Sequence, residues 1–357
     1  MKALQLIVGK TARDRIVEHG LTPDLIRLIV GASGGPKWLI LKGLDRFLCH
    51  DFLPQAKQKI DLVGSSIGAW RMTVYAHPDT GVTFDKFLES YFSFRTETLK
   101  TTADLTRASY DILNELYPAG EARRLIDNPQ RNLNIVAVRG KGVAGSKKQM
   151  LEAAGIVAAA GANRLSRDRL DKFFERVVFH SGEGAACPDV WQDFSRKDVK
   201  LTPEILADTL MASGSIPFVS EPLMDIAGAG PGVYRDGGVI DYHFDVPWSY
   251  SDGIVLYPHF YDYIVPGWFD KSRPGRRATG KVWDQMLMLS PSPELVASLP
   301  GGKITDRTDF TSMNDDARLA YWQCVVDESE RMAEEFAELL DDHGKLVDSL
   351  QSARVEI

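Results

Sequence analysis

The chain has 357 residues, of which 44% are hydrophobic and 25% charged, a composition typical of a globular protein with a large buried core. Its net charge of −7 supplies no positive field that would attract nucleic acid, so no nucleic-acid partner is expected. The three cysteines (Cys49, Cys187 and Cys324) form no Cys-x-x-Cys pair, which argues against a disulfide framework or a cysteine-rich zinc site, and we expect neither a metal nor another cofactor.

The first predicted elements are a helix at 10–19, ended by Gly20, and a buried strand at 25–30 that is rich in β-branched residues. A glycine turn and a helical stretch at 38–48 follow this strand, and a second strand at 60–63 is followed in the same way. This repeated order of strand, turn and helix predicts a mainly parallel α/β sheet. Further strands are expected at 133–138, 176–180, 233–235 and 253–258, and further helices at 83–127, 202–213 and 317–340.

The sequence contains no internal repeat and no convincing linker, so we expect one domain over 1–357. In it, a motif-bearing core at about 25–260 is followed by a helical C-terminal extension at about 283–357. The N-terminus does not resemble a signal peptide, and no apolar run reaches the roughly 18 residues of a membrane span. We therefore expect a cytoplasmic protein.

The turn after the second strand, Gly64-Ser-Ser66-Ile67-Gly68, matches G-x-S-x-G, the pattern of a nucleophile elbow. In such a turn the serine has a strained backbone, and the glycines remove side chains that would collide with the neighbouring strand and helix. The free N–H groups of the helix start favour a developing negative charge. The pattern predicts Ser66 as a nucleophile, although a tight loop without function would match it too.

The glycine loop at 31–37 is not a phosphate-binding loop, because proline and tryptophan stand where that motif requires glycine and a hydroxyl residue. Its backbone is instead suited to hold the oxyanion of an acyl-transfer intermediate, where one fixed donor contributes about 2.7–4 kcal/mol. Gly34 and Gly35 permit a close approach, and the Ile67 amide beside Ser66 is a further candidate donor. A plain turn that covers a helix start is the alternative.

An acidic residue ends the predicted strand at 233–235 and is followed by two glycines, as Asp236-Gly237-Gly238. The same residues are common in ordinary turns, so this motif alone does not indicate a function. Its importance comes from its combination with the elbow and the glycine loop.

These three signatures, in this order, resemble the patatin-like phospholipases. That family combines a glycine-rich oxyanion loop and a basic residue, here Ser33 to Lys37, with a G-x-S-x-G elbow and an aspartate followed by small residues. The segment 211–217 is similar to the family's small-residue segment before the aspartate. The resemblance covers about 25–260 and implies a three-layer α/β fold with a mainly parallel sheet flanked by helices. The loop differs from the family's at Ser33, where glycine is usual, and at Lys37, where arginine is commoner.

The resemblance implies a dyad in which Asp236 accepts the proton of Ser66 directly, followed by an acyl-enzyme that water cleaves. It also implies substrates that are fatty-acyl esters, such as phospholipids or lysophospholipids. An acyltransferase with the same acyl-enzyme and a non-catalytic lipid-binding protein are the alternatives. The implied oxyanion hole consists of Gly34, Gly35 and Ile67, and the supporting residues are Lys37, Gly64, Gly68, Gly237 and Gly238.

An ordinary Ser-His-Asp site is a further alternative, with His180, His243 or His259 as the base. A dyad without an imidazole is expected to keep turning over well below pH 6. The segment 260–277 combines aromatic and basic residues. It either makes transient contact with an anionic membrane surface or closes the mouth of the active site.

Overall fold

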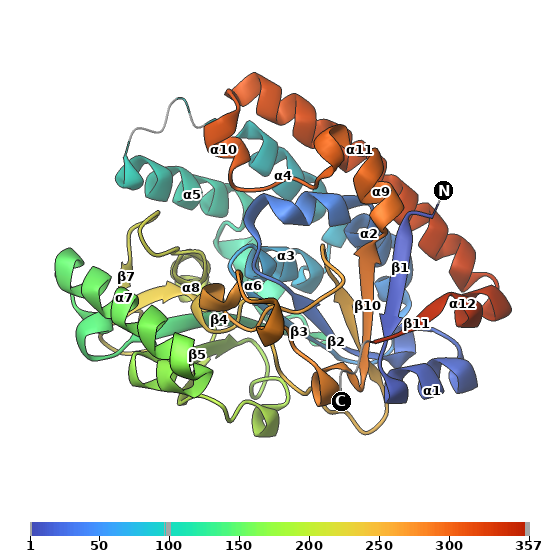
Figure 1. Ribbon diagram of the computed structural model, residues 1–357, viewed down its shortest axis with the longest axis horizontal. Coiled ribbons are helices and arrows are strands. Elements are labelled where there is room, and N and C mark those ends of the chain that lie inside the picture. The colour runs from blue at the N-terminus through green and yellow to red at the C-terminus, as the bar shows by residue number, and fades with distance from the viewer. Residues whose placement is uncertain (1, 96, 98–100, 354–357) are drawn as a thin grey trace.

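The computed structural model describes residues 2–95, 97 and 101–353. Within them, one sheet of eleven strands has the order β11-β1-β10-β9-β2-β3-β4-β5-β6, with β8 paired to β4 and β7 paired to β8 (Figure 1). The strands are β1 (Leu4–Val8), β2 (Ile26–Gly31), β3 (Ile60–Ser65), β4 (Arg131–Gly140), β5 (Phe174–His180), β6 (Arg196–Lys200), β7 (Leu223–Met224), β8 (Val233–Asp236), β9 (Ile254–Pro258), β10 (Met286–Pro291) and β11 (Leu350–Ser352). The helices are α1 (Lys10–His19), α2 (Lys42–Phe47), α3 (Ile67–Ala76), α4 (Thr80–Ser93), α5 (Thr102–Leu116), α6 (Ala119–Ile126), α7 (Gln149–Leu165), α8 (Leu206–Ser213), α9 (Pro293–Ser298), α10 (Asp309–Ser312), α11 (Asp315–Leu340) and α12 (His343–Ser349).

The central part of the sheet is parallel. Strands β10, β9, β2, β3 and β4 pair in parallel in this order, and β1 and β5 add antiparallel pairs on either side. Helices flank the sheet: α3 packs on β2, β3 and β4, while the long α11 passes beside α2 (Figure 1). The predicted class, an α/β fold with a mainly parallel sheet between helices, is confirmed.

Most elements predicted from the sequence are present. The six predicted strands correspond to β2, β3, β4, β5, β8 and β9, and the helix at 10–19 ends at Gly20, where φ is 73°. The stretch at 38–48 is only partly α-helical, because a 3-10 turn at 35–41 precedes α2 and a π turn follows it. The predicted helical region 83–127 contains α4, α5 and α6, and residues 96 and 98–100 lie outside the described residues.

The local sequence did not predict the strands β1, β6, β7, β10 and β11, or the helices α7, α9, α10 and α12. Strand β10 begins Met-Leu-Met-Leu, side chains with high helix propensity, and its pairing with β1 and β9 decides its conformation. The segment 283–357, expected to be a helical extension, contains the helices α9 to α12 and also the strands β10 and β11. That the chain forms one domain stays a prediction.

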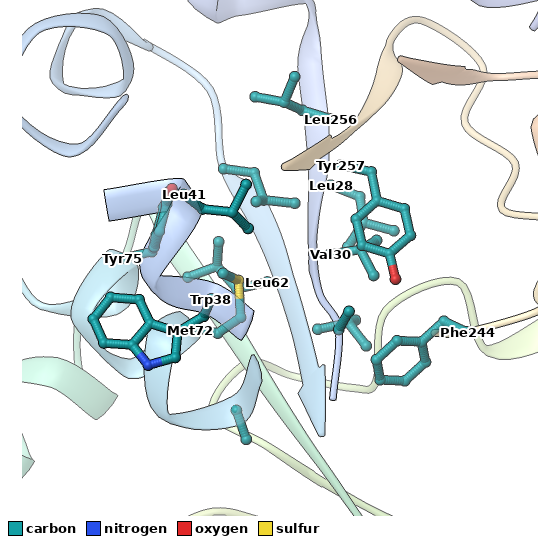
Figure 2. Packing of buried hydrophobic residues seen from close by; sticks show 14 of the residues in the cluster. Leu28, Val30, Trp38, Leu41, Leu62, Met72, Tyr75, Phe244, Leu256 and Tyr257 are labelled. Atoms are coloured by element: carbon teal, nitrogen blue, oxygen red, sulfur yellow. The ribbon is translucent and has the colours of Figure 1, made fainter. Parts of the chain in front are cut away.

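Buried apolar side chains pack on both sides of β2. Figure 2 shows Trp38, Met72 and Tyr75 on one side of this strand and Phe244 and Tyr257 on the other. Burying a large apolar side chain contributes roughly 1.5–3 kcal/mol, so this packing holds β2 and β3 firmly together. The two glycine turns follow the carboxyl ends of these strands and are brought side by side.

Candidate active site

The turn between β3 and α3 has the geometry of a nucleophile elbow. Strand β3 ends at Ser65 and helix α3 begins at Ile67, so Ser66 forms the corner by itself, with φ 54° and ψ −134°. A positive φ is unfavourable for a residue with a Cβ atom and persists only where the surroundings enforce it. Here the Ser66 amide donates a hydrogen bond of 2.9 Å to Ser213 Oγ, which helps to hold the corner.

Two glycines allow α3 to approach β2 and β3 closely. A Cβ atom on Gly68 would lie 2.0 Å from the carbonyl oxygen of Gly31, and one on Gly64 would lie 2.5 Å from the carbonyl oxygen of Gly68. In the sheet, Gly31 is the register partner of Gly64. Any side chain here would push the helix away from the strands, which is the steric reason for both elbow glycines.

The fold brings the hydroxyl of Ser66 and the carboxylate of Asp236 into direct contact. Ser66 Oγ donates to Asp236 Oδ2 at 2.7 Å, although 170 residues separate the two. Asp236 reaches the elbow because β8 pairs with β4, which in turn pairs with β3. The Gly238 amide donates to the other carboxylate oxygen, Oδ1, at 2.7 Å, so both oxygens of Asp236 are held.

The two glycines after Asp236 are also required by close packing. A Cβ atom on Gly237 would lie 2.2 Å from the carbonyl oxygen of Val136, and one on Gly238 would lie 2.6 Å from Ser33 Oγ. Ser33 Oγ is itself 2.6 Å from Ser65 Oγ. The glycine loop, the elbow and the Asp-Gly-Gly turn thus pack against one another.

Burial changes the acidity of Asp236, which is only 6% exposed. Desolvation raises its pKa to about 6, against the opposing effects of the Ser66 and Gly238 hydrogen bonds and the charges of Lys271 and Arg307. A carboxylate with this pKa is a stronger base than usual and is still mostly ionised at pH 7. Well below pH 6 this carboxylate would be mostly protonated, which argues against the turnover expected there from a dyad without an imidazole; that expectation stays a prediction.

The predicted oxyanion donors lie next to Ser66. Gly34 and Gly35 line a small cavity of about 30 Å³ together with Ser66. Gly35 has φ 58°, in the left-handed region that favours glycine. Ile67 is the first residue of α3, and an N–H group at this position has no acceptor within its own helix.

Lys37, the basic residue of the glycine loop, forms an ion pair with Asp306. Beside it, the Thr305 hydroxyl donates to the carbonyl oxygen of Pro36 at 2.6 Å. These contacts attach the loop to a C-terminal segment that carried no recognisable motif.

Two basic residues of the site were not predicted. Lys271 and Arg307 both line the small cavity that contains Ser66 and Asp236. The sequence placed Lys271 only in the basic part of 260–277, and Arg307 has no motif around it. No local signal identifies either residue, because the packing of distant segments brings them to the dyad.

The three candidate histidines make other contacts. His180 Nδ1 bonds a backbone carbonyl two residues away, and His243 and His259 each accept a backbone N–H at Nδ1. Burial lowers the pKa of His243 well below its usual value and that of His259 to about 3. Within the described part of the chain, no histidine bonds Ser66 or Asp236, and no group of three or more His, Cys, Asp or Glu side chains is placed to hold a metal.

A large apolar cavity of about 630 Å³ opens at Ser66. Ser66 and Ile67 line it, and helices α3, α4, α5, α8 and α10 contribute side chains to its wall. This volume is in the range of ordinary small-molecule sites. Among the apolar side chains that line it are Trp70, Phe87, Phe94, Leu105, Leu210 and Phe310.

The first part of segment 260–277 packs largely inward up to Asp270, whereas Lys271 and Arg277 in its second part are exposed. Phe260 and Ile264 are buried, and the Arg277 guanidinium lies 3.5 Å from the ring centre of Tyr263. Tyr263 lines a second cavity next to the dyad. Closure of the mouth of the site by this segment stays a prediction.

Exposed large apolar side chains occur elsewhere, on α7 at Met150, Val157 and Leu165 and in the loop at Phe218. Among residues 2–95, 97 and 101–353, no helix has the length and apolarity needed to cross a membrane. Membrane contact through 260–277 stays a prediction.

Comparisons with known proteins supply no family assignment. No protein-family model matches the sequence, and no curated protein matches it either. Among solved structures, VipD from Legionella pneumophila is similar over 99% of this chain and 76% of its own, with 12% sequence identity and a TM-score of 0.33. A likeness this distant carries no argument about function.

Proposed function

We propose that this protein is a serine acyl-ester hydrolase with Ser66 as nucleophile and Asp236 as base. The observation that carries the proposal is the 2.7 Å hydrogen bond from Ser66 Oγ to Asp236 Oδ2, made at a corner with positive φ. The resemblance of the three motifs to those of patatin-like phospholipases supports the same assignment.

In the proposed reaction, Ser66 Oγ attacks the ester carbonyl while its proton passes to Asp236. A base of pKa about 6 is well matched to this transfer at neutral pH. The N–H groups of Gly34, Gly35 and Ile67 would stabilise the oxyanion, where one donor contributes about 2.7–4 kcal/mol. Asp236 returns the proton to the leaving alkoxide, and it then activates the water that cleaves the acyl-enzyme.

The proposed substrates are fatty-acyl esters, such as phospholipids or lysophospholipids. Support comes from the apolar cavity of about 630 Å³ that Ser66 lines, because an acyl chain held there would be removed from water. The proposal that the chain is related to patatin-like phospholipases rests on the motifs and on their contact in the fold.

A fluorophosphonate probe together with p-nitrophenyl esters of fatty acids tests the proposal. We expect the probe to label the folded protein, and both labelling and turnover to vanish in Ser66→Ala. Asp236→Asn should lower kcat by about 10²–10⁴-fold, the usual contribution of a general base. Ser349→Ala, on the exposed side of α12, is the matched serine control and should behave as the wild type.

Three results would contradict the proposal in distinguishable ways. A folded wild-type protein that neither reacts with the probe nor hydrolyses any ester would be a non-catalytic lipid-binding protein. Turnover that vanishes in His243→Gln but survives in Asp236→Asn would assign the base to an imidazole. Preferential acyl transfer to an added alcohol acceptor would identify an acyltransferase.

A further inference from the structure

A second cavity of about 500 Å³ adjoins the dyad and differs in character from the apolar one. Basic side chains and tyrosines dominate its wall, and one carboxylate lines it among the described residues, that of Asp306. The lining residues that matter here are Lys37, Lys271, Arg307, Tyr242, Tyr261 and Tyr263, and we name this space the cationic cavity.

The cationic cavity shares part of its wall with the small cavity at Ser66. Tyr242, Lys271 and Arg307 line both this cavity and the small cavity that contains Ser66 and Asp236. Ser66 also lines the large apolar cavity. An ester seated at Ser66 therefore has an apolar space for one of its parts and a positively charged space for the other.

The positive charge of the cationic cavity is only partly balanced. Lys37 pairs with Asp306, whereas Lys271 and Arg307 form no ion pair with any described residue. The Lys271 ammonium lies 4.1 Å from the ring centre of Tyr242 and keeps contact with solvent. Loss of part of its water, followed by repulsion from Lys37 and Arg307, lowers the pKa of Lys271 to about 8, against the opposing attraction of the Asp236 and Asp306 carboxylates. An anion bound among these groups would relieve that repulsion.

The chemistry of the lining fits an oxyanion ligand. A guanidinium and two ammonium groups are the side chains that bind phosphate and carboxylate best, through charge-assisted hydrogen bonds. Tyrosine hydroxyls add neutral donors at the same site. A hydrocarbon chain would gain little in such a space, while the apolar cavity suits it well.

We infer that the cationic cavity binds an anionic group, phosphate or carboxylate, on the alcohol part of the ester, so that the preferred substrates are fatty-acyl esters of an anionic alcohol. The inference rests on the proposed hydrolase function and names its substrate class. The bond between Ser66 Oγ and the acyl carbon forms as the bond to the anionic alcohol breaks, and the alcohol leaves with the proton carried by Asp236. Water then releases the fatty acid.

Three esters with the same acyl chain and the same type of ester bond test the inference. These are 1-oleoyl-glycerol, which is neutral, 1-oleoyl-glycerol 3-phosphate, which is anionic, and 1-oleoyl-glycero-3-phosphocholine, which is zwitterionic. We expect kcat/KM of the full chain to be highest for the anionic ester, by about 10- to 100-fold over the neutral one, as charge-assisted hydrogen bonds allow.

Variants of the cationic cavity should reduce this preference. Lys271→Met and Arg307→Gln are each expected to lower the ratio of kcat/KM for the anionic over the neutral ester by about tenfold, and Lys271→Arg should retain it. Lys281→Met is the matched control, because Lys281 is exposed and lines none of these cavities, and it should keep the wild-type ratio. Glycerol 3-phosphate should inhibit competitively, and more weakly in Lys271→Met.

Equal kcat/KM for the neutral and anionic esters, or a ratio unchanged in both variants, would overturn the inference while the hydrolase proposal stands. So would an equal loss on all three esters, which would mean that the cations act on Asp236 and not on the substrate. Inhibition by inorganic phosphate as strong as that by glycerol 3-phosphate, without any substrate preference, would assign the cavity to free phosphate. Failure of the proposed function is separate, because the wild type would then react with neither esters nor the fluorophosphonate probe.

Discussion

The hydroxyl of Ser213 accepts the backbone N–H of Ser66 at 2.9 Å and donates to the carbonyl oxygen of Val136 at 2.7 Å. Ser213 is fully buried at the end of α8, and Val136 belongs to β4. The strained corner is therefore tied to the sheet through one side chain. Because the Ser66 amide is already bonded, the proposal assigns the oxyanion donor on this side of the site to the Ile67 amide.

Ser213→Ala should weaken both the fold and the proposed activity. The Ser66 N–H and the Val136 carbonyl would each lose the Ser213 hydroxyl as a hydrogen-bond partner. Leaving one buried polar group without a partner costs about 1–3 kcal/mol, and we expect the free energy of unfolding to fall by at least the cost of one such group. The corner would also lose its anchor, so kcat for p-nitrophenyl esters should fall by roughly tenfold or more, as small misplacements of a reacting group do. Denaturant unfolding and steady-state kinetics measure the two effects.

Ser329→Ala is the matched control for this variant. The Ser329 hydroxyl, fully buried on α11, accepts the Gly43 amide at 3.0 Å and donates to the Val326 carbonyl at 2.6 Å, which is the same bonding pattern away from the dyad. It should lose similar stability and keep its kcat. An equal loss of kcat in both variants would show that the Ser213 contact has no special role at the nucleophile.

Gly68→Ala should prevent the close approach of α3 to β2. The new Cβ atom would lie 2.0 Å from the Gly31 carbonyl oxygen, a backbone atom that cannot move without the strand. We expect the free energy of unfolding to fall by about 3 kcal/mol, the upper end for overpacking, and turnover to be lost. Gly161→Ala is the control: no atom lies within 4 Å of its new Cβ, so this variant of α7 should be up to about 1 kcal/mol more stable. A Gly68→Ala protein of normal stability would contradict the steric argument.

Asp236→Asn should make the protein more stable at neutral pH while it removes the proposed base. The folded-state pKa of Asp236 is raised to about 6 from 3.8, so the unfolded chain ionises first as the pH rises. The free energy of unfolding of the wild type therefore decreases between about pH 4 and pH 6 and stays lower above pH 6. A pKa difference of one unit corresponds to about 1.36 kcal/mol, so the whole decrease is up to about 3 kcal/mol. Asparagine cannot ionise, so Asp236→Asn should be more stable than the wild type by the full amount at pH 8 and equally stable near pH 3.5.

Thermal unfolding of wild type and Asp236→Asn at pH 3.5, 5 and 8 measures this difference. Asp252→Asn is a useful comparison, because the hydrogen bond from Arg27 lowers the pKa of Asp252, and its removal should not stabilise the protein at pH 8. Turnover of the wild type should fall as the pH drops through about 6, as the base becomes protonated. If Asp236→Asn were less stable than the wild type at pH 8, burial would not be the dominant influence on this carboxylate.

The sequence was sufficient to predict the elements that surround the nucleophile and the residue types of the candidate dyad. The elbow at Ser66 is recognisable because a strand, a glycine turn and a helix follow one another within a few residues, and each has a local pattern. Asp236 stands at a strand end followed by two glycines, but only the combination of this motif with the elbow and the glycine loop, and the family resemblance it carries, pointed to its role. Strand β10 was missed because its Met-Leu-Met-Leu start favours a helix locally, and its pairing with β1 and β9 decides its conformation. Helix α7 is alanine-rich, so its local sequence does favour a helix, although it was not predicted.

Tertiary structure alone decided how these residues act on one another. The 2.7 Å contact between Ser66 and Asp236 depends on β8 pairing with β4, and the raised pKa of Asp236 depends on the many segments that exclude water from it. Lys271 and Arg307 reach the site from segments without any motif. Local patterns describe which conformation a short stretch prefers, whereas distances, desolvation and cavity walls arise from contacts between residues far apart in the chain. For this reason the candidate chemistry could be named in advance, and the charge that surrounds it could not.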